Sequence, residues 1–265
     1  MENIGLDEMI LLRAEGLTKN FNGVRAVDDF TFGVEAGSIT ALIGPNGSGK
    51  TVTFNLIAGF YRPTGGRIFF KDREITGLPP YKIFDLGIGR TFQNIRLFPQ
   101  MTVLDNLLLG LKFEKGESLW AALFRTKAMR REEEENRAKA IELLKMIGLE
   151  EKRDTQAEDL SHGQRRLLEI ARTLGTGAEF FLLDEPTAGV FPNTLPKLLE
   201  IVRDLKKAGK TILFIDHNLN FAMELADRVV VIDHGRKIAE DTPAGVMRNE
   251  AVLDAYMGKG RRQRA

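Results

Sequence analysis

The chain has 265 residues, with 38 Lys and Arg against 37 Asp and Glu, so its formal net charge is +1. This balance argues against a general nucleic-acid binder, which needs a basic face. Apolar residues make up 43% of the chain, which argues against disorder. Cysteine is absent, which excludes a disulfide framework, a cysteine-based zinc finger and a thiol nucleophile.

We expect neither a membrane span nor a secretory signal. The longest apolar runs, such as 180–183 and 212–215, fall far short of the ~18 residues that a spanning helix needs. The N-terminus, MENIGLDEMI, is acidic and lacks a positively charged start followed by an apolar stretch. The sequence therefore predicts a soluble cytoplasmic protein.

The first elements in chain order are short strands separated by glycine-bearing turns. Strands are predicted over 10–17 and 24–34, which could be neighbours, and over 39–43 and 67–70. The segment 52–57 directly follows a glycine-rich stretch and is predicted to be helical. A strand-rich first part of the chain is therefore expected, interrupted by one helix.

The middle of the chain, from 102 to about 148, has a mostly helical pattern. We interpret the charged run 130–135 as the solvated start of a long helix, and a charged interaction tail is the alternative. A helical insertion is expected over 112–127. The apolar residues that recur at helical spacing are Ala138, Ile141, Leu144 and Ile147.

The last third of the chain alternates between predicted helices and strands. Helices over 167–174 and 195–202 have one apolar face, and the strand over 180–183 is apolar on both faces, as a central parallel strand is. Further strands are predicted over 211–215 and 229–232. This alternation predicts a parallel sheet covered by helices.

A glycine-rich stretch matches the pattern G-x-x-x-x-G-K-[ST]. Glycines let successive backbone N–H groups point at phosphate oxygens, and the helix that follows adds its positive dipole end. Lys50 would supply a charge for the β and γ phosphates, and Thr51 a hydroxyl for Mg²⁺. A coincidental turn is the alternative, but the preceding strand and the following helix provide the required context. The predicted phosphate-binding residues are Gly44, Pro45, Asn46, Gly47, Ser48, Gly49, Lys50 and Thr51.

Two carboxylates, Asp184 and Glu185, follow the predicted strand over 180–183. An acid at the end of a parallel strand lies at the sheet edge where ligands bind. Asp184 is predicted to hold Mg²⁺, directly or through water, and Glu185 to polarise the attacking water. Alone, the pattern fits an ordinary acidic turn equally well, but the glycine-rich stretch favours the functional interpretation.

The stretch Leu160-Ser161-His162-Gly163-Gln164 precedes an amphipathic helix. Ser161 is a good N-cap, and the N-terminus of a helix also attracts anions. These properties alone favour a simple cap over a ligand site.

Taken together, these motifs resemble the ATP-binding cassette (ABC) family, the nucleotide-binding subunits of membrane transporters, and the family's landmarks occur in order over nearly the whole chain. Residues 160–164 resemble the family signature LSGGQ, with His162 in place of its first glycine. The resemblance implies that two copies pair head to tail. Ser161 and Gly163 of one copy would then contact the γ-phosphate held by the other, with Gln164 also in the nucleotide site.

Three further residues have roles that the resemblance implies. Gln93, in the stretch TFQN, would sense Mg²⁺ and the attacking water and touch the membrane subunit; a solvent-facing glutamine is the alternative. His217 stands where the family has a switch histidine that acts in hydrolysis, and a structural histidine is the alternative. Phe21 matches the aromatic residue that stacks on adenine, although a core phenylalanine would fit the same position.

One stretch departs from the family pattern. The family's D-loop usually ends in Asp, but here Phe191 stands at or near that position in the run TAGVFP over 187–192. We therefore expect the dimer contact there, and the coupling between the two nucleotide sites, to differ.

The implied fold is α/β: a P-loop NTPase-type ABC ATPase with a RecA-like core, an N-terminal antiparallel β subdomain and a helical subdomain over about 94–175. A single domain is expected from 8 to 258, followed by a basic, frayed tail over 259–265. ATP and Mg²⁺ are the implied cofactors.

Within the family, the motif GRTFQ at 89–93, the insertion over 112–127 and the end LDAYMG at 253–258 resemble the cassette subunits of branched-chain amino acid uptake systems. The histidine in the signature also resembles urea and short-amide importers, which stay open as an alternative. The implied partners are transmembrane permease subunits, a second ABC subunit in a homodimer or heterodimer and, indirectly, a solute-binding protein; no nucleic acid is implied. Such a subunit would be cytoplasmic and peripheral on the inner face of the cell membrane.

Two other function classes compete with a transport ATPase. A non-transport ABC ATPase, such as a translation or DNA-repair factor, would usually carry two cassettes or a long coiled-coil insertion, and this chain has neither. A module that binds nucleotide without hydrolysing it is disfavoured by the presence of both Glu185 and His217. The loop over 94–99 offers three large apolar side chains and is predicted to dock a permease, with a local core anchor as the alternative.

Overall fold

The computed structural model describes residues 10–93, 95–111 and 127–257. The expected insertion over 112–127, apart from its last residue, and the expected frayed tail lie outside the described residues, as does Asn94. The chain separates into two compact units. The first contains the chain up to Arg90, Glu179–Ala188 and the chain from Val202, and the second contains Thr91–Ala178 and Gly189–Ile201.

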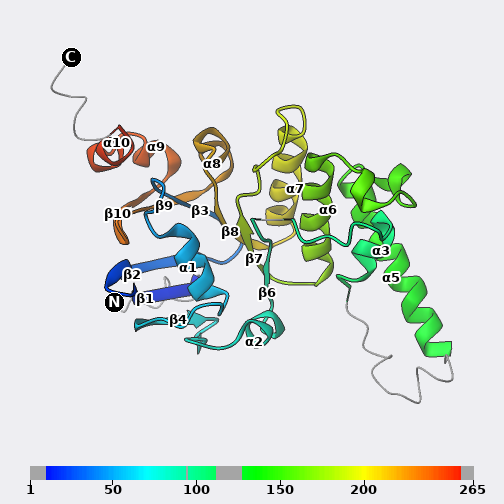
Figure 1. The fold of residues 1–265 in the computed structure, drawn as a ribbon, viewed down its shortest axis with the longest axis horizontal. Helices are drawn as coiled ribbons and strands as arrows, with labels where there is room; N and C mark the ends of the chain where they lie inside the picture. Colours follow the sequence, from blue (N-terminus) through cyan, green and yellow to red (C-terminus); the bar gives the residue numbers. More distant parts are fainter. Residues whose placement is uncertain (1–9, 94, 112–126, 258–265) are drawn as a thin grey trace, which may run out of the picture. The chain divides into compact units, whose positions relative to one another are not determined.

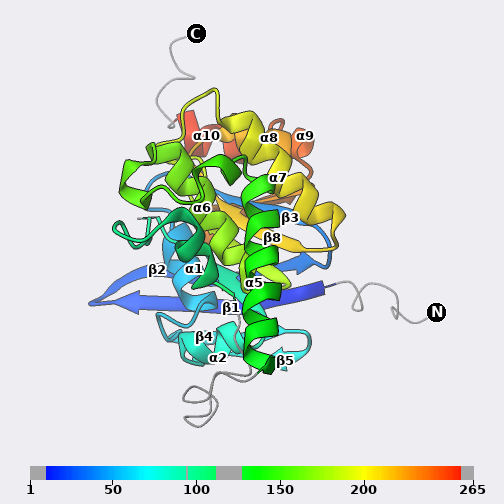
Figure 2. The ribbon, with the colours of Figure 1, turned by 90° about the vertical axis from the view of Figure 1, so that its right-hand side faces the viewer.

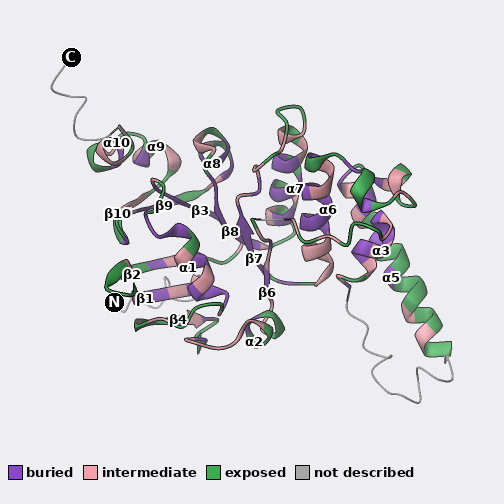
Figure 3. Ribbon diagram, viewed as in Figure 1, coloured by how far each residue is buried: buried purple, intermediate pink, exposed green. Residues whose placement is uncertain are grey.

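The larger sheet of the first unit is made of β3 (Ile39–Ile43), β6 (Ile88–Arg90), β7 (Phe180–Asp184), β8 (Thr211–Ile215), β9 (Arg228–Asp233) and β10 (Arg236–Asp241). Its strand order is β10-β9-β3-β8-β7-β6, and it is parallel except for the β9–β10 hairpin (Figure 1). Every residue of β3, β7 and β8 is buried, as expected for parallel strands covered on both faces (Figure 3). The predicted parallel sheet is therefore confirmed.

A smaller, antiparallel sheet is made of β1 (Ile10–Phe21), β2 (Val24–Glu35), β4 (Gly65–Phe70) and β5 (Arg73–Glu74). Its order is β2-β1-β4-β5, so the two strands predicted as neighbours do pair. Buried side chains of this sheet join those of the larger sheet and of α1 (Lys50–Ile57) in one hydrophobic core. In it the rings of Phe70 and Phe180 lie 6.0 Å apart. Each such buried side chain contributes roughly 1.5–3 kcal/mol, and Phe54, Leu56 and Ile57 anchor α1 to this core.

The other helices of the first unit are short and lie mostly late in the chain. The C-terminal helix α10 was not predicted from the sequence, and neither was the antiparallel strand β10. Among the described residues, no helix combines the length and the apolar composition that crossing a membrane requires. These helices are α2 (Pro80–Asp85), α8 (Leu219–Leu225), α9 (Pro243–Val246) and α10 (Glu250–Met257).

The second unit is helical. It contains α3 (Val103–Leu108), α5 (Lys127–Met146), α6 (His162–Gly175), the start of α7 (Leu195–Lys207) and the short turns η2 (Glu150–Lys152) and η3 (Ala157–Asp159). The helices α3, α5 and α6 pack against one another. Most of α5 is exposed, with its buried residues Asn136, Ala140 and Leu144 near its C-terminal half (Figures 2 and 3). The charged run 130–135 is therefore the solvated start of a long helix, as predicted.

One buried polar side chain fastens a loop to this unit. Asn106, in α3, donates from its amide nitrogen to the carbonyl groups of Phe98 and Thr102, at 3.0 Å each. Its side-chain oxygen accepts from the N–H of Phe98 at 2.9 Å. The two carbonyl groups also accept from the N–H groups of Met101 and of Asn106 itself, so the contact that only the Asn106 side chain supplies is the one to the N–H of Phe98.

We expect Asn106→Leu to lower the free energy of unfolding by about 1–3 kcal/mol, because it removes the side-chain hydrogen bonds of Asn106 and leaves the N–H of Phe98 without its acceptor. Urea denaturation measures the change. Asn20→Leu, at an exposed position of β1, is the matched control and should change stability by less than about 0.5 kcal/mol. Equal losses for both variants would contradict the anchoring role.

Candidate functional site

The glycine-rich loop over 44–51 joins β3 to α1 in the first unit. Within it Ser48, Gly49 and Lys50 are buried, whereas Asn46 and Thr51 are exposed. Gly49 adopts φ +110°, and a Cβ atom there would lie 2.5 Å from the carbonyl oxygen of Ala26. Only glycine fits this position, so the motif's second glycine has a steric cause.

Lys50 is a buried cation held by backbone dipoles. Its Nζ donates to the carbonyl oxygens of Gly44 at 2.7 Å and of Pro45 at 2.8 Å, and only 6% of the residue is exposed. Burial lowers the pKa of Lys50, and the nearby charge of Glu185 opposes this effect. Among the described residues the buried Ser48 Oγ finds no hydrogen-bond partner. Within the described part of the chain, Lys50 hydrogen-bonds carbonyl groups and no carboxylate. Its positive charge and the hydroxyl group of Ser48 both fit a phosphate-bearing ligand.

The two predicted carboxylates stand at the carboxyl edge of the larger sheet. Asp184 ends β7 and is 2% exposed. Glu185 follows with φ +49°, a left-handed conformation that is costly for a residue with a side chain. Its N–H donates to the carbonyl oxygen of Ile215 at 2.9 Å. Strain of this kind persists where the surrounding structure imposes it, and it often marks a functional position.

His217 and Glu185, 32 residues apart in the chain, are brought into direct contact. His217 Nε2 lies 2.8 Å from Glu185 Oε1, so the imidazole N–H donates to the carboxylate. His217 is exposed, while Glu185 is only partly so. The contact orients the Glu185 carboxylate at the carboxyl edge of the larger sheet.

A third side chain at this edge, Arg90, was not predicted as a site residue. Its Nη2 donates to Asp184 Oδ2 at 2.8 Å, and its Nη1 donates to the side-chain oxygen of Asn55 at 2.8 Å. The guanidinium group lies over the ring of Phe60, 5.3 Å from its centre. Arg90 belongs to the GRTFQ stretch, which pointed to a branch of the family but not to this ion pair.

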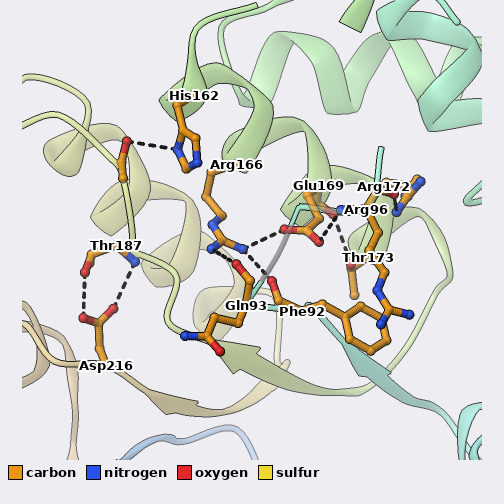
Figure 4. A network of polar contacts seen from close by, with 11 residues as sticks. Phe92, Gln93, Arg96, His162, Arg166, Glu169, Arg172, Thr173, Thr187 and Asp216 are labelled. Carbon is orange, nitrogen blue, oxygen red and sulfur yellow. Dashed lines mark hydrogen bonds and ion pairs between the residues drawn. The ribbon is translucent and has the colours of Figure 1, made fainter. Parts of the chain in front are cut away.

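Asp216 is a second residue that the sequence pattern missed. Its carboxylate accepts from the N–H of Thr187 at 3.0 Å and from its hydroxyl group at 2.6 Å (Figure 4). It also accepts from the N–H of Asn218 at 2.8 Å. Asp216 is buried and thereby orders the loop after Glu185 together with the residue after His217.

In the second unit, Arg166 of α6 holds the backbone beside Gln93. It is only 1% exposed, and its Nη1 and Nη2 donate to the carbonyl oxygens of Phe92 at 2.7 Å and of Gln93 at 2.9 Å (Figure 4). Its Nη1 also lies 2.8 Å from Glu169 Oε2. Gln93 itself is exposed, and its expected part in sensing Mg²⁺ and water stays a prediction.

The same face of α6 continues to hold this segment. Burial raises the pKa of Glu169, and the charge of Arg166 opposes that effect. Glu169 Oε1 accepts from the N–H of Arg96 at 3.3 Å, and Arg172 donates to the carbonyl oxygen of Arg96. Side chains spaced three residues apart on α6 thus fasten the backbone of Phe92, Gln93 and Arg96 (Figure 4).

Ser161 caps α6, as predicted. Its Oγ accepts from the N–H of Gln164 at 3.3 Å, and the Gln164 side-chain oxygen accepts from the N–H of Ser161 at 3.1 Å. This reciprocal pair is a capping box. Gly163 is buried, and a Cβ atom there would lie 3.5 Å from the side chain of Thr194.

Phe21 and Phe191 are both surface residues. Phe21, at the end of β1, is 37% exposed, so it is not the core residue that was weighed as an alternative. Its ring meets that of Tyr61 edge to face at 5.3 Å, and Lys19 Nζ lies 4.9 Å from its centre. Phe191, which stands at or near the last position of the expected D-loop, is 64% exposed.

The C-terminal helix α10 contacts the glycine-rich loop through Tyr256. Tyr256 is 37% exposed, and the partial burial of its phenol raises its pKa to about 12, an effect that the nearby backbone of Gly44 opposes. A pocket of about 620 Å³ lies between the outer side of the loop and α10. Its lining includes Pro45, Asn46, Gly47, Ser48, Ala251 and Asp254.

Comparison with protein families gives two matches. The family model described as "ABC transporter" matches residues 27–188. The model described as "Branched-chain amino acid ATP-binding cassette transporter" matches residues 236–261, which include β10, α9 and α10. The chain is also 40% identical over 250 residues to the high-affinity branched-chain amino acid transport ATP-binding protein LivG of Escherichia coli K12. That similarity covers 94% of this chain and 98% of LivG.

Solved structures give the same picture. A structure of the ADP conformation of MJ1267, an ATP-binding cassette of an ABC transporter, matches with a TM-score of 0.81 and 37% identity. The match covers 95% of this chain and 100% of MJ1267. The dimeric post-hydrolysis state of the cassette MJ0796, bound to ADP and Pi, matches with a TM-score of 0.74 and 26% identity over 88% of this chain and 98% of that one. The expected α/β cassette fold is therefore confirmed.

Because Tyr256 keeps its proton to about pH 12 in the folded chain, against an ordinary value of 10.0, its phenol stabilises the fold below pH 10. This contribution is lost as the pH rises from 10 towards 12. We expect Tyr256→Phe to flatten the fall in the free energy of unfolding over this range. Urea denaturation at stepped alkaline pH tests it, with Tyr81→Phe at an exposed position as the control. Identical slopes for the two variants would contradict the raised pKa of Tyr256.

Proposed function

Since this chain belongs to the ABC transporter family, we propose that it is the ATP-hydrolysing subunit of a branched-chain amino acid importer and drives separate permease subunits. The similarity to LivG over almost the full length of both chains supports this substrate class over the urea and short-amide alternative. The matched segment 236–261 supports the same branch. The observation that supports hydrolysis is the contact between Glu185 and His217 in the unit that also holds the glycine-rich loop.

The nucleotide site is proposed to lie on the first unit. The backbone N–H groups over 44–51 and the charge of Lys50 would bind the phosphates, and Phe21 would stack on the adenine. Thr51 and Asp184 would hold Mg²⁺, which when bound neutralises phosphate charge and so lowers the barrier to attack. The exposed hydroxyl position of Thr51 and the buried carboxylate of Asp184 fit the oxygen ligands that Mg²⁺ prefers.

Glu185 would accept the proton of the attacking water, and His217 would keep its carboxylate in place through the Nε2 hydrogen bond. We propose that two cassettes pair for this reaction, with Ser161, Gly163 and Gln164 of one completing the site of the other. The dimeric form of MJ0796, bound to ADP and Pi, supports this arrangement. Both a homodimer and a heterodimer are compatible with the proposal.

The permease is proposed to dock on the second unit, beside the segment that α6 holds. A groove of about 190 Å³ is lined there by Ile95, Leu97, Pro99, Ala157, His162 and Arg165, among others. Phe98, next to this groove, is 52% exposed. Large apolar side chains in an exposed loop favour a partner site. The assembled transporter would place the chain on the inner face of the cell membrane and connect it indirectly to a solute-binding protein.

Glu185→Gln keeps the size of the side chain and removes the base. We expect the variant to bind ATP with near-normal affinity and to hydrolyse it at least ~10²-fold more slowly. A fluorescent ATP titration and a phosphate-release assay measure the two properties. Glu224→Gln, at a surface carboxylate paired with Arg203, is the control and should retain normal turnover. Normal turnover of Glu185→Gln would place the base elsewhere.

Leu97→Asp should abolish co-purification with the permease and amino-acid uptake in cells, because it replaces an apolar side chain of the groove lining with a carboxylate. ATP affinity of the purified subunit should stay nearly unchanged. Leu109→Asp, at an exposed position after α3, is the matched control and should assemble normally. Normal uptake with Leu97→Asp would show that the permease docks elsewhere.

A further inference from the structure

One departure from the family pattern, His162, contacts the loop that holds the other, Phe191. His162 replaces a glycine of the signature, and the loop after Glu185 has an unusual sequence that includes Gly189. His162 Nδ1 lies 3.1 Å from the carbonyl oxygen of Gly189 (Figure 4). Because a carbonyl group only accepts, the hydrogen on Nδ1 is the one donated.

The two residues also fit together sterically. Gly189 adopts φ +68°, which favours glycine. A Cβ atom at this position would lie 2.3 Å from Cε1 and 2.4 Å from Nδ1 of the His162 ring. Gly189 is therefore required both by its own backbone and by the imidazole that occupies the adjacent space.

This contact lies where the chain passes from one unit to the other, since Ala188 belongs to the first unit and Gly189 to the second. On the first side, the N–H of Ala188 donates to the carbonyl oxygen of Glu185 at 3.0 Å, and Thr187 is held by Asp216. On the second side, Gly189 is held by His162 at the start of α6. Thr187 is thus fastened within the first unit and Gly189 within the second.

The imidazole of His162 also borders a groove. His162 is exposed and lines the 190 Å³ groove together with Leu97 and Arg165. A single side chain therefore borders both the groove and the loop. A glycine in its place would contact neither through a side chain.

We propose that His162 is a positioning residue that sets the place of the loop over 187–191 through the carbonyl group of Gly189, and that it links the groove to this loop. The inference rests on the proposed function for its consequence: a permease segment seated in the groove presses on the imidazole, and the shift reaches the loop beside Glu185. Without His162 the loop keeps its covalent path but loses the hydrogen bond from α6 to Gly189.

The test uses two substitutions that differ in where they place a donor. In His162→Asn the amide nitrogen is separated from Cα by the same number of bonds as Nδ1, so the hydrogen bond to Gly189 is retained. His162→Ala removes the donor and the ring. Amide hydrogen exchange over 187–194 in the full chain, measured by mass spectrometry, reports the loop directly and does not depend on turnover.

We expect exchange over 187–194 to be about tenfold faster in His162→Ala and unchanged in His162→Asn, with the same melting temperature for all three proteins. In ATP hydrolysis, His162→Ala should lower kcat with KM unchanged, and His162→Asn should rescue it. His162→Ala exchanging like the unmodified chain, or His162→Asn behaving like His162→Ala, would overturn the inference.

A second comparison tests the steric part. Gly189→Ala should lower the melting temperature more in the His162 background than in the His162→Ala background, because only the ring collides with the new methyl group. Equal shifts would overturn the paired fit. If the unmodified chain hydrolyses no ATP, the proposed function fails, while the exchange result still decides the role of His162.

Discussion

A carboxylate buried at the end of a parallel strand needs a partner of opposite charge, and Asp184 obtains it from Arg90. Both side chains are almost fully buried. The same guanidinium group donates to Asn55 in α1, the helix that opens with Lys50. Arg90 thereby connects the ends of β6 and β7 to α1, the helix that follows the glycine-rich loop. Because Glu185 directly follows Asp184 in the chain, its position depends on the ion pair between Arg90 and Asp184.

The second unit also contains a buried arginine that holds neighbouring polar groups, Arg166. Its guanidinium group donates to the carbonyl oxygens of Phe92 and Gln93 and to the carboxylate of Glu169. A planar group with several fixed donors suits such a task better than lysine does. The segment from Arg90 to Gln93 is thus held by a buried arginine near each end, one in each unit. Movement of α6 would be passed to Gln93 through the hydrogen bond from Arg166 to its backbone.

Much of this could be predicted from the sequence where the cause is local. The glycine-rich loop, the strand ending in Asp184 and the cap at Ser161 depend on residues that are close in the chain. The ion pair between Arg90 and Asp184 joins residues 94 positions apart, and no spacing rule predicts it. The left-handed backbone of Glu185 and the fit of His162 to Gly189 likewise arise from tertiary packing. The strand β10 was missed although it pairs locally, in a hairpin with β9.

The free energy of unfolding of Arg90 variants tests the dependence on this ion pair most directly. Arg90→Met should lose about 3–5 kcal/mol, because it leaves the Asp184 carboxylate buried beside an apolar side chain. The free energy of unfolding of Arg90→Lys should lie between those of Arg90→Met and the unmodified chain. A single ammonium group does not reproduce the guanidinium's paired contacts to Asp184 and Asn55. Urea denaturation of the nucleotide-free chain gives the values. An Arg90→Met variant as stable as the unmodified chain would contradict the central place given to this ion pair.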